Sequence, residues 1–263
     1  MRIGITGGKG GTGKSTIATA LARPGTLLVD MDVDCPNDHL ILSLSLEKVQ
    51  DVKQRMPSIT ESCDACGACV DVCIENALIQ IPGKKPECIQ SQCNGCGACY
   101  HRCPKGSIQW EEKVIGSVSK GEGLLSGELN IGEPNAERVV SAMKDIIDQA
   151  EKEVDRTIII DTAAGTHCNV IAALELCDKV FCVAEPTPLG SHDLDLILTL
   201  CARLEKQAQI IINKADIGDT SLIEKLAAKH HVDIVASVPY DESILKGYAK
   251  GHSTKIKELE GLV

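Results

Sequence analysis

Eight of the fourteen cysteines form two copies of one spacing pattern. Each copy reads C-x2-C-x2-C-x3-C, first at Cys63, Cys66, Cys69 and Cys73, and again at Cys93, Cys96, Cys99 and Cys103. Three thiolates at this spacing can surround one corner of a [4Fe-4S] cube, while the fourth points away and binds the other cube. The pattern therefore predicts two [4Fe-4S] clusters, one held by Cys63, Cys66, Cys69 and Cys103 and the other by Cys93, Cys96, Cys99 and Cys73.

The repeat extends beyond the ligands, because Gly67-Ala68 recurs as Gly97-Ala98, which indicates a duplicated half-unit. Zinc fits the spacing poorly, since it prefers four ligands in two separated pairs. A disulfide framework also fits poorly, because the chain starts Met1-Arg2-Ile3 without the features of a signal peptide. We therefore expect a cytoplasmic protein with thiolate-type cysteines.

A glycine-rich segment near the N-terminus could bind phosphate. Residues 8–15 satisfy G-x-x-x-x-G-K-[ST], between an apolar run at 3–5 and a helix-compatible run at 15–22. Backbone N–H groups of such a loop turn toward phosphate oxygens, and the following helix adds its dipole. Lys14 is expected to contact the β and γ phosphates, and the Ser15 hydroxyl to bind magnesium. The expected nucleotide-binding residues here are Gly8, Lys9, Gly10, Gly11, Thr12, Gly13, Lys14, Ser15 and Thr16.

Lys9 makes this loop more specific. The run from Lys9 to Ser15 resembles the deviant Walker A motif of the MinD/Mrp superfamily of P-loop ATPases. In that family the additional lysine reaches across a dimer interface to the partner's nucleotide. The resemblance implies a protein that binds ATP or ADP with Mg and forms a nucleotide-bridged homodimer, or a heterodimer with a related ATPase.

Two further segments are similar to the switch regions of that superfamily. The first runs from Asp30 to Asn37, and the resemblance implies that Asp32 orients the attacking water and that Asn37 lies near the nucleotide; Asp34 competes with Asp32 for that role. The second follows the apolar run 157–160 and begins at Asp161, which is expected to hold magnesium through water. Lys9, Lys14, Asp32 and Asp161 are thus the expected catalytic residues of a slow, partner-stimulated ATPase.

The elements that must position these residues are predicted by apolar runs that alternate with helical patterns. Strands are expected at 26–29, 157–160, 180–183, 209–212 and 234–238, and helices at 192–205 and 222–229. Nearly continuous apolar strands indicate a mostly parallel sheet covered on both faces. We expect an α/β, doubly wound P-loop fold, with its ligands at the carboxyl ends of the strands.

Base recognition gives two different signals. Asn213-Lys214-Ala215-Asp216 matches N-K-x-D, by which many GTPases read guanine. The MinD resemblance implies adenine instead, with Asn213 accepting from the exocyclic amine and with Pro239 and Asp241 in the loop that completes the pocket. We favour ATP.

The cysteine segment interrupts the nucleotide-binding part of the chain. Residues 57–110 resemble a bacterial-type ferredoxin with two clusters, except that Ile74 replaces the proline expected after Cys73. The expected organisation is an ATPase domain at 1–56 and 111–263 with a small inserted α+β ferredoxin-like domain at 57–110. This arrangement resembles MinD-superfamily ATPases that carry an inserted ferredoxin domain.

Composition limits the partners. A net charge of −10 argues against nucleic acid, which needs a basic face. No apolar run approaches the ~20 residues that cross a bilayer, and the C-terminal segment lacks aromatic anchors, so no membrane partner is expected.

Three functions remain open at this stage. The first is nucleotide-gated electron transfer through the two clusters to a redox partner. The second, implied by Mrp-like relatives, is cluster assembly and delivery to an acceptor protein. The third is an ATP-dependent dimerising scaffold whose clusters sense redox state.

Overall fold

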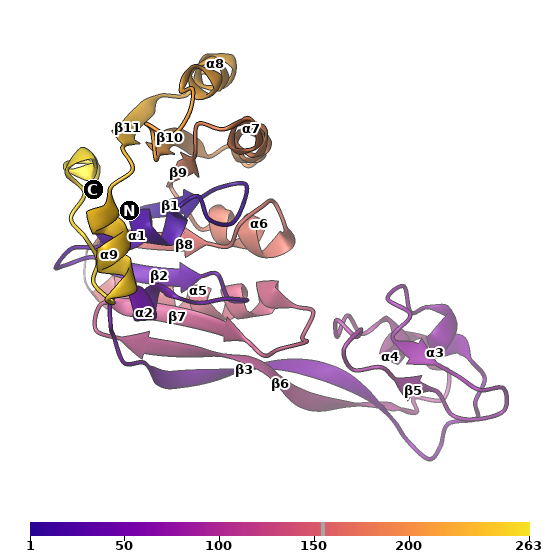
Figure 1. Cartoon of the computed structure of the whole chain (residues 1–263). Coiled ribbons are helices and arrows are strands. Elements are labelled where there is room, and N and C mark those ends of the chain that lie inside the picture. The colour runs from indigo at the N-terminus through magenta and orange to yellow at the C-terminus, as the bar shows by residue number, and fades with distance from the viewer. Residues whose placement is uncertain (154–155) are drawn as a thin grey trace.

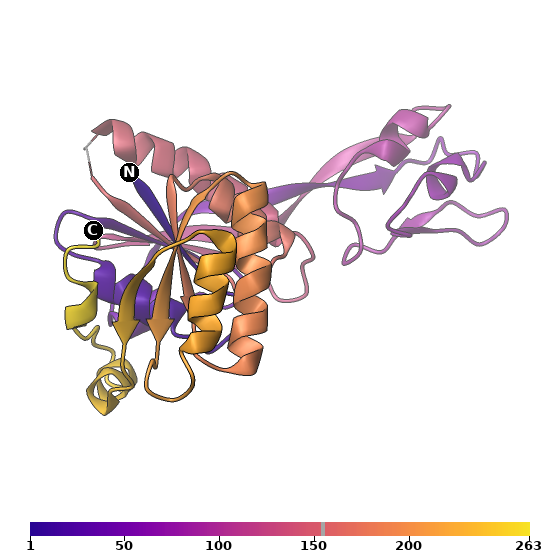
Figure 2. The same cartoon turned by 90° about the horizontal axis from the view of Figure 1, so that it is seen from above.

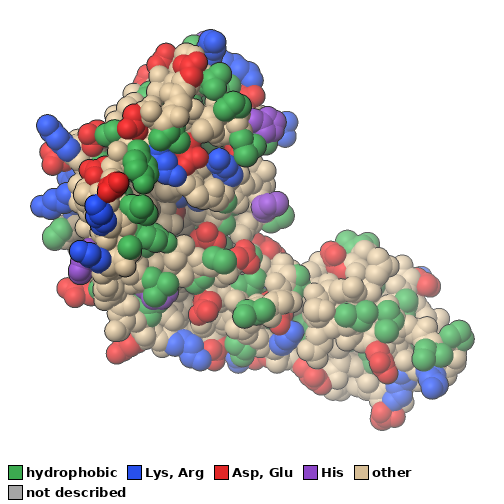
Figure 3. Space-filling view, viewed as in Figure 1, with side chains coloured by type: hydrophobic (Ala, Val, Ile, Leu, Met, Phe, Trp, Pro, Cys, Tyr) green, Lys and Arg blue, Asp and Glu red, His purple; other side chains and the backbone are tan. Residues whose placement is uncertain are grey.

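The computed structural model describes residues 1–153 and 156–263. Within these residues the chain forms a large sheet covered by helices on both faces, and a small cysteine-rich unit at the end of a long two-stranded ribbon (Figure 1). Seen from above, the ribbon carries this unit away from the body of the sheet (Figure 2). In the space-filling view the cysteine-rich unit forms a separate lobe (Figure 3).

The large sheet has nine strands in the described part of the chain, in the order β11-β10-β9-β1-β8-β2-β7-β6-β3. Neighbours from β11 to β7 pair in parallel, whereas β7–β6 and β6–β3 pair antiparallel. The strands are β1 Arg2–Thr6, β2 Leu27–Met31, β3 Glu47–Ile59, β6 Ile108–Gly121, β7 Leu124–Leu129, β8 Ile158–Thr162, β9 Lys179–Ala184, β10 Gln207–Asn213 and β11 Ile234–Val238. The fold is therefore α/β with a large, mostly parallel sheet, as predicted.

Apolar side chains on both faces of the central strands explain why helices cover both sides. In β8, Ile158 and Ile160 face one core and Ile159 faces the other. The first core is closed by α5 Ala136–Glu153, α6 Cys168–Glu175, α7 Pro188–Arg203 and α8 Ser221–His230. The second is closed by α1 Lys14–Leu21, the segment after α2 Asp38–Ile41, α9 Glu242–Ala249 and the short helix η1 Lys257–Leu259.

β3 and β6 form the ribbon that leads to the cysteine-rich unit. Their antiparallel register runs from Glu47 opposite Lys120 to Ile59 opposite Ile108. Both strands continue through the expected domain boundaries at 56/57 and 110/111. β3 is an edge strand of the sheet, and exposed lysines such as Lys48 and Lys53 oppose edge-to-edge association.

The cysteine-rich unit has little regular structure. It contains α3 Ala68–Asp71, α4 Ala98–Arg102 and a two-stranded sheet of β4 Leu78–Ile79 and β5 Glu87–Cys88. Its buried core consists of Cys69, Leu78, Cys99 and Ile108, with a few partly buried neighbours. So small an apolar core is typical of units that need metal or cross-links for stability.

The predicted strands and helices of the sheet are all present, with boundaries that differ by at most one or two residues except at the start of one helix. The helix expected at 192–205 begins at Pro188, because the Thr187 side chain accepts from the Gly190 N–H and proline suits the first helical position. No helix among the described residues combines the length and apolar character needed to cross a membrane.

Candidate functional site

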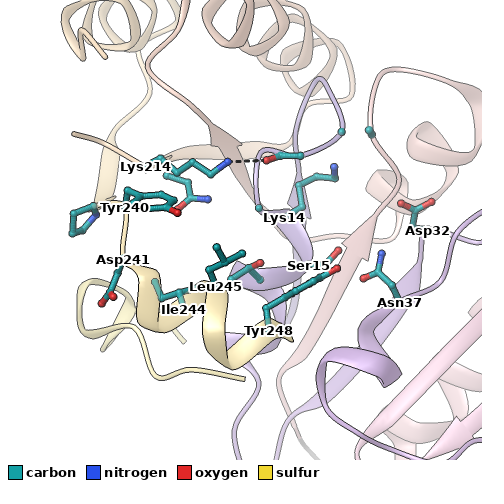
Figure 4. Close-up of a pocket in the computed structure, with 17 residues that line it drawn as sticks. Lys14, Ser15, Asp32, Asn37, Lys214, Tyr240, Asp241, Ile244, Leu245 and Tyr248 are labelled. Carbon is teal, nitrogen blue, oxygen red and sulfur yellow. Dashed lines mark hydrogen bonds between the residues drawn. The ribbon is translucent and has the colours of Figure 1, made fainter. Parts of the chain in front are cut away.

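A cleft lies at the carboxyl edge of the sheet, where the predicted nucleotide residues meet (Figure 4). The loop between β1 and α1 forms its floor, and Gly11 and Gly13 have φ of 83° and 90°, which favour glycine. The Lys14 ammonium donates to the Lys9 carbonyl at 3.3 Å and so lies folded across the loop. The predicted residues that line the cleft are Gly10, Gly11, Gly13, Lys14, Ser15, Thr16, Asp32, Asn37, Asn213, Pro239 and Asp241.

Four predicted residues of the site do not line the cleft. Gly8 packs so closely against Asp193 of α7 that no side chain would fit, and Thr12 is buried beneath the loop. Asp161 is buried at the end of β8, where its carboxylate is hydrogen-bonded to the Ser15 side chain. Lys9 points away toward Glu185, which it contacts at 3.3 Å.

Buried carboxylates gather below the cleft at the ends of β2 and β8. Asp30 accepts backbone N–H groups from Asp32, Asn37 and Asp38, so it fixes the shape of the first switch segment. Burial raises the pKa of Asp30 to about 7 and that of Asp161 to about 8, and repulsion from Asp32 adds to the first shift and repulsion from Asp30 to the second. Lys14 opposes the rise at Asp161 and at Asp32.

Asp38 is the unexpected member of this group. Its side chain is fully buried, and neither carboxylate oxygen has a hydrogen-bond partner in the described structure. Burial, followed by repulsion from Asp161, Asp30 and Asp32, holds its pKa well above the usual range. Such a concentration of acids next to Ser15 and Lys14 is suited to a bound cation.

No group of three or more His, Cys, Asp or Glu side chains in the described ranges is arranged to hold a metal ion. Magnesium in nucleotide sites is typically held by one or two protein groups together with phosphate oxygens and water. Ser15 and, through water, Asp161 are the side chains that would supply the protein's share.

The residues at the base end of the cleft distinguish between recognition of guanine and recognition of adenine by the N-K-x-D segment. The Asn213 amide nitrogen donates to the Thr12 carbonyl at 2.7 Å, which leaves the amide oxygen as an acceptor. Asp216 accepts from the Tyr240 backbone N–H at 2.6 Å and does not line the cleft. The carboxylate that would read guanine is thus engaged in holding the base loop.

Helix α9 forms a wall of the cleft that the sequence analysis missed. Ile244, Leu245 and Tyr248 point toward the cavity, and α9 has no buried residue (Figure 4). The sequence did contain a signal for this helix, because aspartate is a favoured N-cap residue. Asp241 caps α9 by accepting from the Ser243 N–H. Exposed apolar residues on this helix suit a flat ligand such as a base.

Glu185, at the end of β9, pairs with two lysines. It contacts the Lys214 ammonium at 2.5 Å and that of Lys9 at 3.3 Å, and its side chain is only 10% exposed. Burial opposes its ionisation, but the hydrogen bonds and charges of Lys214 and Lys9 outweigh it and lower the pKa of Glu185. The lysine expected to cross a dimer interface is therefore held within its own subunit.

The cysteine-rich unit contains two small hollows. One is lined by Cys63, Cys66, Cys69 and Cys103, and the other by Cys73, Cys93, Cys96 and Cys99. These are the two sets of four that the spacing predicts.

The cysteine-rich unit contains two cysteine loops, the first at residues 63–67 and the second at residues 93–97, and their hydrogen bonds repeat one another. The Ala65 N–H donates to the Cys63 sulfur and the Gly95 N–H to the Cys93 sulfur, each at 3.4 Å. Asp64 and Asn94 likewise accept the N–H of the cysteine two residues on. Backbone N–H groups directed at cysteine sulfur favour the thiolate form, and such bonds tune iron-sulfur clusters.

The innermost cysteine of each hollow is buried. Burial raises the pKa of Cys99 to about 11 and also raises that of Cys69. These thiols therefore stay protonated near neutral pH unless a metal replaces the proton. The donor set fits an iron-sulfur cluster, whose cube binds each thiolate at a different corner and so needs no single point of convergence.

A parallel sheet with a glycine-rich loop after β1 and acids at the ends of β2 and β8 defines a P-loop nucleotide-binding protein. The chain belongs to the family described as the CobQ/CobB/MinD/ParA nucleotide binding domain, whose model matches residues 3–254. It is 34% identical to the uncharacterized protein MJ0579 of Methanocaldococcus jannaschii, over 96% of this chain and 91% of that protein.

Solved structures share the fold. The septum site-determining protein MinD of Pyrococcus horikoshii, complexed with Mg-ADP, aligns with a TM-score of 0.53 and 20% identity, over 96% of this chain and 86% of that one. A ParA family ATPase of Chlorobium tepidum aligns with a TM-score of 0.54 and 20% identity, over 96% and 90%. The family match confirms the expected class of P-loop nucleotide-binding protein, and the solved structures confirm its fold.

Proposed function

We propose that this protein binds and slowly hydrolyses ATP and uses the nucleotide to gate electron transfer through two [4Fe-4S] clusters. The observation that carries the proposal is the match between each predicted set of four cysteines and one hollow of the cysteine-rich unit. Clusters held there would supply one-electron chemistry at low potential. The protein would supply the ligands, the N–H groups directed at sulfur, and a link to the nucleotide cleft.

At the cleft, the chain's own residues account for binding and activation. Backbone N–H groups of residues 10–15 and the Lys14 ammonium would neutralise phosphate, and Ser15 would bind magnesium. Asp32 lies on the opposite wall and points into the cavity, where it can orient water (Figure 4). Adenine is favoured over guanine, because Asn213 retains an acceptor while Asp216 is occupied by Tyr240.

The test is a redox titration followed by EPR, on anaerobically reconstituted protein, without nucleotide and then with ATP and magnesium. A coupling of about 1–3 kcal/mol between two sites is typical and corresponds to roughly 40–130 mV for one electron. We expect two [4Fe-4S] signals, at least one of which shifts by such an amount. Lys14→Ala is the control, and its signals should not respond to ATP.

The outcomes separate the proposal from its rivals. Protein that takes up no iron and sulfide would refute the cluster assignment. Two stable clusters that ignore ATP would refute gating and favour a redox-sensing scaffold. Rapid loss of iron to an apo-acceptor, accelerated by ATP, would favour cluster delivery, a reading that the surface exposure of Cys66 and Cys96 also supports.

A further inference from the structure

The two cysteine loops are duplicates in sequence, but they are held in different ways. The first loop is held within its own unit, where the Gln80 amide donates to the Ala65 carbonyl at 2.9 Å. The second loop has a contact within the unit, where the Asn94 amide donates to the Glu75 carboxylate at 3.0 Å, but it is also held from outside that unit. The Gln54 amide of the ribbon donates to the Cys93 carbonyl at 2.7 Å, and the Arg138 guanidinium of α5 donates to the Asn94 carbonyl at 3.0 Å.

A third contact ties Gln54 to the start of α5. The Asn135 amide donates to the Gln54 side-chain oxygen, and the two side chains lie in the buried junction between ribbon, loop and helix. Gln54 is 1% exposed and Asn135 is 6% exposed. Buried amides of this kind are costly to separate, because a partner left without its hydrogen bond loses its solvation as well.

The repeat itself differs where the second loop meets this junction. Ala65 of the first loop corresponds to Gly95 of the second, and both have positive φ. A Cβ atom at Gly95 would lie 2.7 Å from the Arg55 carbonyl oxygen and 3.5 Å from the Arg138 guanidinium. The second loop therefore needs glycine at position 95, because it lies directly against the ribbon. The first loop has Ala65 at the equivalent position, which agrees with its different attachment.

The junction also connects to the nucleotide cleft through packed elements. α5 packs along α6, which begins just after the second switch segment at Asp161–Gly165. At the start of α6, the Asn169 amide donates to the Asp34 carboxylate of the first switch at 3.3 Å. Both switches thus adjoin α6, α6 packs against α5, and Arg138 near the start of α5 holds the second cysteine loop.

We propose that Gln54, Asn135 and Arg138 are positioning residues that clamp the second cysteine loop to α5. Movement of the switches then reaches the cluster site of Cys73, Cys93, Cys96 and Cys99, but not the site of Cys63, Cys66, Cys69 and Cys103. The proposal rests on the proposed function only in assigning clusters to these cysteines. Displacement of the loop would change the N–H groups and the solvent near the Cys93 sulfur, and these set the potential of a cluster.

Hydrogen exchange of the full-length protein tests the clamp without relying on iron. Arg138→Ala and Gly95→Ala should make amides 93–97 exchange roughly threefold to tenfold faster, the size of one lost hydrogen bond, and leave amides 63–67 unchanged. Gln80→Ala is the matched control and should affect only the first loop. Arg138→Lys keeps a donor and should restore slow exchange.

Nucleotide and cluster measurements complete the test. In the wild-type protein, ATP with magnesium should alter exchange at 93–97 but not at 63–67, and Arg138→Ala should abolish this response. On reconstituted protein, Arg138→Ala should shift the midpoint of one EPR signal alone, which Cys96→Ser and Cys66→Ser assign to its cluster.

The proposed clamp would be refuted if Arg138→Ala left the exchange rates of amides 93–97 unchanged, or if ATP changed the exchange rates of both loops equally. Failure of the proposed function looks different. A protein that binds no iron would still show selective exchange at 93–97 if the clamp exists, and lack of that selectivity would refute the clamp alone.

Discussion

Asp38 is one of three buried carboxylates that together give the protein's stability a pH dependence. Asp30, Asp38 and Asp161 all have pKa values raised above the ordinary 3.8, chiefly by burial. Between about pH 4 and about pH 8 the folded protein therefore binds protons that the unfolded chain has released. The free energy of unfolding must fall as pH rises through this window, in the absence of a cation.

Asp38→Asn tests this argument at one residue. The substitution removes one of the repelling charges at nearly constant volume. We expect the nucleotide-free protein to gain roughly 1–3 kcal/mol in the free energy of unfolding at about pH 8 and little at about pH 4. Thermal unfolding at several pH values measures the slope. A slope as steep as in the wild-type protein would contradict the role assigned to Asp38.

Asn213 gives a prediction about the choice of base at the same scale. Its amide nitrogen is fixed by the Thr12 carbonyl, so Asn213→Ala removes both a support of the phosphate loop and the acceptor for adenine. We expect ATP to bind about 10-fold to 100-fold more weakly. Competition between ATP and GTP for a fluorescent analogue measures this, with Asp216→Ala as a comparison that should not create or destroy a preference for GTP.

Among the elements, those with local signals could be predicted from sequence and those with distant partners could not. The phosphate loop and the strand before Asp161 combine apolar runs with residues whose spacing carries chemistry. The ribbon lacks such signals, because β3 is rich in charged and amide residues and pairs with a strand that lies beyond the whole cysteine-rich unit in the sequence. Helix α9 was missed because it is short and has no buried residue, and its apolar residues mainly line the cleft, with Ile244 alone among them also packing against the core.

The register of β3 and β6 predicts that the sheet can fold without the cysteine-rich unit. Ile59 lies opposite Ile108 at the far end of the pair, so residues 60–107 can be replaced by an Asn-Gly turn that closes the hairpin. The shortened protein should fold and bind ATP with nearly unchanged affinity, because none of the residues that line the cleft lies within 60–107. Circular dichroism and nucleotide titration measure this. Loss of folding would mean that the sheet depends on the cysteine-rich unit.

At the scale of the whole molecule, the ion pair between Lys9 and Glu185 within one chain bears on how two subunits would associate. The resemblance to deviant Walker A ATPases implies that Lys9 would leave its own subunit in a dimer, whereas in this structure it pairs with Glu185. Nucleotide-dependent dimerisation would therefore begin with breaking this pair. Because the Lys9 side chain is 27% exposed, the pair contributes only about 1 kcal/mol or less.

Two substitutions should change dimerisation in opposite directions. Lys9→Ala should still bind ATP but remain monomeric with ATP and magnesium, whereas Lys14→Ala should lose binding as well. Glu185→Gln frees Lys9 and should strengthen the ATP-bound dimer by a few-fold, the size of an exposed ion pair. Analytical ultracentrifugation at several protein concentrations measures the dissociation constant. If Lys9→Ala dimerised as well as the wild-type protein, the lysine would have no role between subunits, and its pairing with Glu185 would serve only to shape the loop within its own chain.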